Sequence, residues 1–188
     1  MRCFLAIELP EVVRDQLALL QGRLGSQVDG VRWTRTDHVH LTIKFLGEVS
    51  DRDLARVCET AAAVAARYAP FEIEVRGAGC FPPRGPARIV WVGIPEPPQP
   101  LLDCQGACED GYAEVGFEAE RRPYRPHLTI GRVKDARAGR DIRLAVESEQ
   151  RFDAGRFPAE ELVLFQSVLG RSGPTYTVIS RSPFAGGG

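Results

Sequence analysis

The pattern of hydrophobic and polar positions divides the chain into short strands and amphipathic helices. Apolar or β-branched runs and period-two alternation predict strands, whereas apolar residues three and four apart predict helices. Strands are predicted over 3–9, 71–77, 88–94, 159–170 and 174–181, and helices over 10–24, 51–69 and 101–115. Proline and glycine predict loops at 77–87 and 170–174, the stretch 134–150 has no clear pattern, and the tail 184–188 is expected to be disordered.

The order of these elements indicates the fold class. Strands and helices do not alternate strictly along the chain, which favours an α+β arrangement of mainly antiparallel sheets over a doubly wound parallel sheet. Strand, helix and motif strand recur in both halves. We therefore expect two similar lobes around a central cleft.

One tetrapeptide occurs in both halves of the pattern. His-Leu-Thr-Ile stands at 40–43 and again at 127–130, which is 127 − 40 = 87 residues later, and it uses two of the three histidines. In a strand, successive side chains point to opposite faces. Each copy therefore buries Leu and Ile and presents His and Thr on its polar face.

Composition restricts the classes of function. The chain has 188 residues, 24 basic and 25 acidic residues and a net charge of −1, so generic coating of nucleic acid is not expected. No secretory signal or membrane-spanning run is visible, and five unevenly spaced cysteines fit free thiols in a cytoplasmic protein. Arginines crowd around the second motif and could bind phosphate: Arg121, Arg122, Arg125 and Arg132.

Two imidazoles across a cleft can catalyse displacement at phosphorus. One accepts the proton of the attacking hydroxyl or water, and the other protonates the leaving oxygen. Histidine suits both roles because its ordinary pKa of about 6.5 makes both protonation states available near neutrality. Threonine hydroxyls can donate to the phosphoryl oxygens. This chemistry requires no metal and no cofactor.

"HLTIKFLGE" and "PHLTIGR" resemble the paired His-x-Thr signatures of the two-histidine (2H) phosphoesterases, specifically the bacterial and archaeal RNA 2′,3′-cyclic phosphodiesterases, formerly called 2′-5′ RNA ligases. The similarity also covers "RCFLAIELP" and "ELVLFQSVLGRSGPTYTVI". It implies one bilobal domain over 1–188 with pseudo-two-fold lobes. It also implies His40, Thr42, His127 and Thr129 as catalytic residues.

The resemblance further implies the reaction and its partners. A terminal 2′,3′-cyclic phosphate would be hydrolysed to a 2′-phosphate with the 3′ oxygen leaving, and weak 2′-5′ ligation would be the reverse reaction. The substrates would be RNA ends or small cyclic-phosphate nucleotides. We expect a monomer that does not bind membranes. Two questions stay open: which histidine is the general acid and which the general base, and which nucleobase the substrate prefers.

Residues beside the motifs are candidates for substrate contacts. Arg132 and Phe45 occupy equivalent places, each five residues after a motif histidine, and could contact phosphate and a base. Strict alternation places both on the face opposite the histidines. Gly131 could permit a bulge that redirects Arg132, whereas nothing comparable redirects Phe45.

Other aromatic and basic residues complete the candidates. Tyr124 and Arg125 precede the second motif and could line the cleft, and alternation places Lys44 on the polar face of the first motif, where it could bind phosphate. Trp33 is a candidate platform for a base, whereas a core position is favoured for Trp91.

Two other functions remain as alternatives. His38, His40 and His127 could form a three-histidine zinc site of a zinc-dependent hydrolase. The chain could also bind RNA ends without turning them over. Both threonines and the repeated tetrapeptide favour the metal-independent phosphodiesterase.

Overall fold

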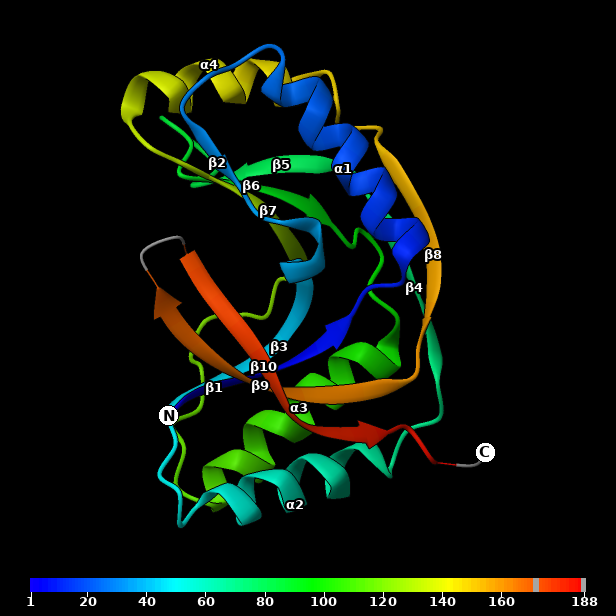
Figure 1. The fold of residues 1–188 in the computed structure, drawn as a ribbon. Coiled ribbons are helices and arrows are strands. Elements are labelled where there is room, and N and C mark those ends of the chain that lie inside the picture. Colours follow the sequence, from blue (N-terminus) through cyan, green and yellow to red (C-terminus); the bar gives the residue numbers. More distant parts are fainter. Residues whose placement is uncertain (171–172, 187–188) are drawn as a thin grey trace.

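The computed structural model describes residues 1–170 and 173–186 (Figure 1). Its helices and strands, in chain order, are β1 (Arg2–Glu8), α1 (Glu11–Gly25), β2 (Val31–Trp33), a 3₁₀ turn (Thr36–His38), β3 (His40–Glu48), α2 (Leu54–Ala65), β4 (Phe71–Arg76), β5 (Ala78–Phe81), β6 (Ile89–Gly93), α3 (Gln99–Glu114), β7 (His127–Val133), α4 (Ala136–Glu147), β8 (Asp153–Ala159), β9 (Glu161–Gly170) and β10 (Gly173–Pro183).

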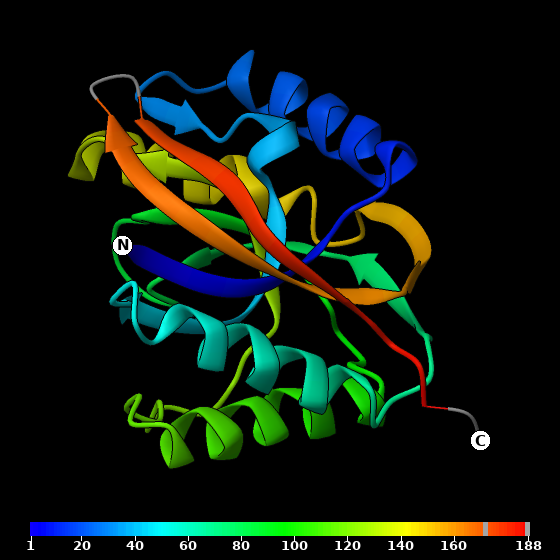
Figure 2. The same cartoon turned by 60° about the horizontal axis from the view of Figure 1, so that its bottom comes forward.

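Two four-stranded sheets form the framework, with strand orders β10-β9-β1-β3 and β2-β7-β6-β5. Every strand pair is antiparallel, which confirms the α+β prediction. α2 and α3 cover the outer face of the first sheet, and α1 and α4 lie on the outer side of the second (Figures 1 and 2). β4 and β8 pair with each other and connect the two sheets along one side.

Each lobe takes segments from both halves of the chain. α1 comes from the first half, yet the side-chain amide of Gln21 donates to the backbone oxygen of Ile130 on β7, at 2.9 Å. Conversely, α3 comes from the second half and packs against α2 and β3. One continuous hydrophobic core therefore runs through both lobes.

Two local predictions were wrong, the loop at 77–87 and the disordered tail, and the 134–150 stretch, for which no structure was predicted, forms a helix. The 77–87 stretch contains the strand β5 as well as a loop, and the unpatterned 134–150 stretch contains α4, which Asp135 caps by accepting from two backbone amides. The tail is ordered through residue 186, since Phe184 is buried against Phe71 and Gly186 donates to the backbone oxygen of Tyr68. The predicted loop at 170–174 lies partly outside the described residues.

Two helical glycines allow a test of how α4 packs. A Cβ at Gly139 would lie 2.5 Å from the backbone oxygen of Ala87, whereas a Cβ at Gly106 in α3 would meet nothing within 4 Å. Gly139→Ala should lower the free energy of unfolding by about 1–3 kcal/mol, because backbone must move. Gly106→Ala should raise it by about 0.5–1 kcal/mol through helix propensity. Urea denaturation of both variants measures this, and equal shifts would contradict the close packing of α4.

Candidate active site

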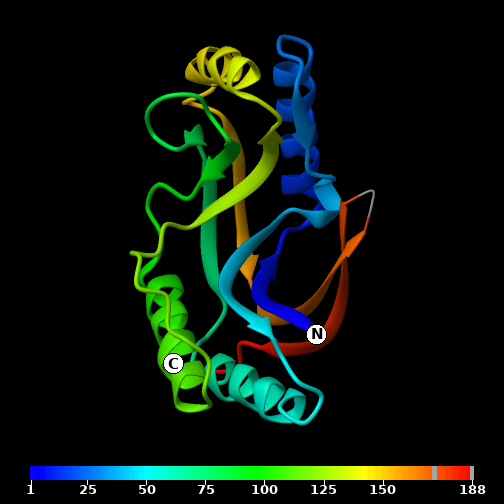
Figure 3. The same cartoon turned by 90° about the vertical axis from the view of Figure 1, so that its left-hand side faces the viewer.

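The two motif strands lie next to each other between the lobes. β3 forms the edge of the first sheet, β7 lies between β2 and β6 in the second, and the two strands contact each other (Figure 3). His40 and His127 begin these strands and are both half-buried. Leu41 and Leu128 behind them are fully buried, as the alternation predicts.

A bulge follows the first motif. In the pairing of β3 with β1, Thr42 lies opposite Ala6 and Lys44 lies opposite Leu5, so that Ile43 is an extra residue. An extra residue reverses the side-chain alternation of the residues that follow it, up to the next irregularity of the strand.

The second motif carries a bulge at the equivalent place. In the pairing of β7 with β6, Thr129 lies opposite Trp91 and Gly131 opposite Val90, so that Ile130 is the extra residue. The last residue of each tetrapeptide is therefore a bulge, so the two copies share an irregularity of the backbone as well as a sequence.

Because of the bulges, Phe45 and Arg132 lie on the faces opposite to those that strict alternation predicts. Phe45 turns to the side of His40: its ring lies 6.0 Å from the Phe4 ring, which stacks on His40 at 4.7 Å, and it is 68% exposed. Arg132 is exposed. It acts electrostatically on Tyr176, on β10 of the other lobe: burial raises the pKa of the Tyr176 hydroxyl, and the positive charge of Arg132 partly offsets this increase.

The prediction that Lys44 shares the polar face of His40 was wrong. Lys44 is 3% exposed and its ammonium pairs with the Glu109 carboxylate and donates to the backbone oxygen of Glu118 at 3.0 Å. The bulge turns this side chain toward α3. A buried, paired ammonium on that side does not contact a phosphate beside His40, so its predicted role in substrate binding is withdrawn.

Both histidines are held by the same local contact. Nδ1 of His40 lies 2.9 Å from the backbone oxygen of His38, and Nδ1 of His127 lies 2.7 Å from that of Arg125, two residues upstream in each case. A carbonyl oxygen can only accept, so each Nδ1 carries a proton and donates it. Nε2 is then the nitrogen that exchanges protons, in both imidazoles.

The surroundings of the two imidazoles differ. The His40 ring stacks on Phe4 and meets the edge of Tyr176 at 5.3 Å, with Phe165 at 6.1 Å. Burial lowers the pKa of His40 from 6.5 to about 4; the contact with the His38 carbonyl and the charge of Glu8 oppose this, and the His38 ring adds to it. His127 instead meets the edge of Phe81, at 5.1 Å.

Tyr124 connects the two motifs. Its hydroxyl donates to the backbone oxygen of Thr42 at 2.9 Å, and its pKa is raised because the ring is buried. The segment that leads into the second motif is thereby attached to the first motif strand. The structure places Tyr124 where its hydroxyl positions the two strands relative to each other.

The three histidines do not form a zinc site. His38 lies on the 3₁₀ turn before β3, not on the strand, and its ring packs against Tyr176 at 5.1 Å. In the part of the chain that the structure describes, no three His, Cys, Asp or Glu side chains gather as metal ligands. The five cysteines are free thiols.

The sequence did not reveal the aromatic residues around the histidines. Phe4, Phe165 and Tyr176 come from three different strands, and Phe81 lies in a stretch predicted to be a loop. Their packing depends on long-range strand pairing, which leaves no local sequence signal.

No helix within residues 1–170 and 173–186 is long and apolar enough to cross a membrane.

Comparisons with known proteins agree with this geometry. The family model "LigT like Phosphoesterase" matches twice, over 7–91 and 92–176. An RNA 2′,3′-cyclic phosphodiesterase of Methanothermobacter thermautotrophicus is 36% identical over 94% of this chain and 95% of its own length. One of Methanocaldococcus jannaschii is 31% identical over 95% of this chain and 98% of its own.

Solved structures share the fold. The protein TT0787 of Thermus thermophilus superposes with a TM-score of 0.84 at 27% identity, over 99% of both chains. Escherichia coli LigT complexed with 3′-AMP superposes with a TM-score of 0.79 at 26% identity, over 97% of both chains. With two matched halves that each contain a His-x-Thr strand, the chain belongs to the LigT-like phosphoesterases of the two-histidine (2H) superfamily.

Proposed function

We propose that this protein hydrolyses the 2′,3′-cyclic phosphate at RNA ends to a 2′-phosphomonoester without a metal ion or other cofactor. The observation that carries the proposal is the pair of His-x-Thr strands with the same Nδ1 contact and the same bulge. His40, Thr42, His127 and Thr129 are the proposed catalytic residues. The protein acts as one bilobal unit, as a monomer and in the cytoplasm.

The proposed reaction is an in-line displacement. Nε2 of one imidazole takes a proton from water as its oxygen bonds to phosphorus, and Nε2–H of the other gives a proton to the 3′ oxygen as its bond to phosphorus breaks. Thr42 and Thr129 donate hydroxyl hydrogens to the non-bridging oxygens, where negative charge develops. The same displacement, with a 5′-hydroxyl in place of water as the nucleophile and the 3′ oxygen again leaving, is the weak 2′-5′ ligation.

RNA as the substrate class is supported by the relatives. The relatives at 36% and 31% identity are RNA 2′,3′-cyclic phosphodiesterases, and the E. coli LigT structure is a complex with 3′-AMP, a nucleotide. The exposed Phe45 ring and the Arg132 guanidinium supply a stacking surface and a charge for such a ligand, one from each motif strand. We propose both as substrate contacts.

Product analysis tests the proposed reaction. With an oligoribonucleotide that ends in a 2′,3′-cyclic phosphate, and with EDTA present, we expect a 2′-phosphate as the product. His40→Ala and His127→Ala should each lower turnover by roughly 10²–10⁴-fold, because each removes one proton transfer. Product isomers separated by chromatography provide the measurement.

His38→Asn is the matched control for these variants. It removes the third imidazole but keeps the backbone oxygen that holds His40, so most of the activity should remain. A 3′-phosphate product, or loss of activity in EDTA or in His38→Asn, would contradict the proposal.

The environment of His40 leads to a prediction about pH. With its pKa lowered to about 4, folded His40 stays neutral while an unfolded chain takes up a proton near pH 6.5. The free energy of unfolding is therefore unaffected by this group at pH 7 and falls as the pH falls from 6.5 toward 4, by about 3 kcal/mol. Histidine NMR signals followed from pH 8 to 4 measure the midpoint directly. An ordinary midpoint for His40 would show that the aromatic contacts do not exclude water.

A further inference from the structure

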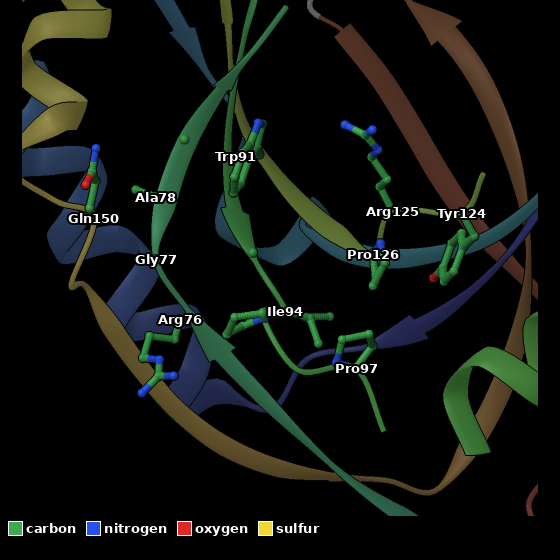
Figure 4. A pocket seen from close by; sticks show the side chains of 13 residues that line it. Arg76, Gly77, Ala78, Trp91, Ile94, Pro97, Tyr124, Arg125, Pro126 and Gln150 are labelled. Atoms are coloured by element: carbon green, nitrogen blue, oxygen red, sulfur yellow. The ribbon is translucent and has the colours of Figure 1, made fainter. Parts of the chain in front are cut away.

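A groove of about 610 Å³ lies beside the second motif (Figure 4). Three glycines line it, together with Trp91 and three apolar residues that follow β6, and Arg125 lies at its edge. The apolar residues are Ile94, Pro95 and Pro97. This size lies within the range of small-molecule sites. None of the catalytic groups proposed above lines it.

The groove is continuous with the face that carries the catalytic groups. In the antiparallel pairing of β6 with β7, Gly93 lies opposite His127 and Trp91 lies opposite Thr129. Paired residues project from the same face of a sheet. The groove therefore begins one strand away from His127, with no side chain between them at Gly93.

A missing side chain also gives Trp91 its position. Gly79 pairs with Trp91, and a Cβ at Gly79 would lie 2.2 Å from one carbon of the indole ring and 2.4 Å from another. The benzo ring thus lies over the backbone of β5, in space that any other residue would fill. Trp91 is half-buried, so part of its surface stays available for stacking.

A positively charged side chain, Arg125, lies at the end of the groove where Trp91 lies. The Arg125 side chain is exposed and extends toward the end occupied by Trp91, whereas Arg76 lies at the other end (Figure 4). The backbone oxygen of Arg125 holds Nδ1 of His127. The charge is therefore placed close to the reacting group by the chain itself.

We propose that this groove binds the nucleotide on the 5′ side of the cyclic phosphate, with its base on Trp91 and the linking phosphate at Arg125. The inference rests on the proposed function. A 2′,3′-cyclic phosphate closes the 3′ end of an RNA, so the chain continues only in the 5′ direction. With the terminal base on Phe45 as proposed above, the groove beside the site receives the preceding nucleotide. Stacking on an aromatic ring tolerates any base.

The test compares kcat/KM for a dinucleotide that ends in a 2′,3′-cyclic phosphate with kcat/KM for a mononucleoside 2′,3′-cyclic phosphate. The wild-type ratio should be roughly 10 or more, from one stacked base and one phosphate contact. Gly79→Ala, which must displace the Trp91 ring, and Arg125→Gln should each lower the ratio several-fold. Arg125→Gln changes an exposed side chain and is expected to fold.

Each variant has a control of the same chemical change. Gly22→Ala in α1 adds a Cβ with nothing within 4 Å, and Arg56→Gln removes an exposed arginine from α2. Both should keep the wild-type ratio. A wild-type ratio near one, or an unchanged ratio in both groove variants, overturns the inference and leaves the proposed function intact.

The groove can also be tested without turnover. If the wild type hydrolyses neither substrate, the proposed function fails, and calorimetric affinities for adenosine 2′-phosphate and for a diadenosine ending in a 2′-phosphate decide about the groove. Tighter binding of the diadenosine that is lost in Arg125→Gln supports the inference. Equal affinities overturn it.

Discussion

One extra residue in each motif strand determines which side chains share a face with the motif histidine. Without the bulges at Ile43 and Ile130, strict alternation would turn Phe45 and Arg132 away from the histidines. Burying the guanidinium of Arg132 without a partner would cost several kcal/mol. The bulges avoid this cost and leave both side chains exposed. The repeated tetrapeptide therefore supplies the histidine and threonine, and the bulge that follows supplies different neighbours to each half.

Each bulge also places two consecutive residues on the buried side of its strand, and the two halves accommodate the second of these residues differently. At the second motif Gly131 leaves room for Trp33, since a Cβ there would lie 3.0 Å from that ring. At the first motif Lys44 is buried and needs partners, which Glu109 of α3 and the backbone oxygen of Glu118 provide. The same carboxylate accepts from the amide of Glu120. The segment leading to the second motif is thus attached to the first through a buried ion pair as well as through Tyr124.

Sequence predicted what depends on neighbours along the chain and missed what depends on pairing. Periodicity located α1 and β6, and alternation placed His and Thr together on the polar face of each motif. β5 was missed because Gly79 weakens its strand signal, and that glycine is needed for Trp91, which lies beside the groove and not in the core. α4 was missed because it buries few large apolar side chains. The predicted faces of Lys44 and Phe45 were the wrong way round, because the bulge between them and His40 depends on the pairing with β1, which the local sequence does not show.

The unequal surroundings of two equally held imidazoles have a consequence for the order of events at the site. Aromatic rings around His40 keep it neutral in the free protein, and a neutral imidazole can take a proton but cannot give one from Nε2. An anionic phosphate in the cleft stabilises the imidazolium by charge, and most strongly where water is excluded. In the proposed reaction, arrival of the substrate therefore raises the proton affinity of His40. The aromatic contacts would then couple the protonation of this histidine to the presence of the phosphate.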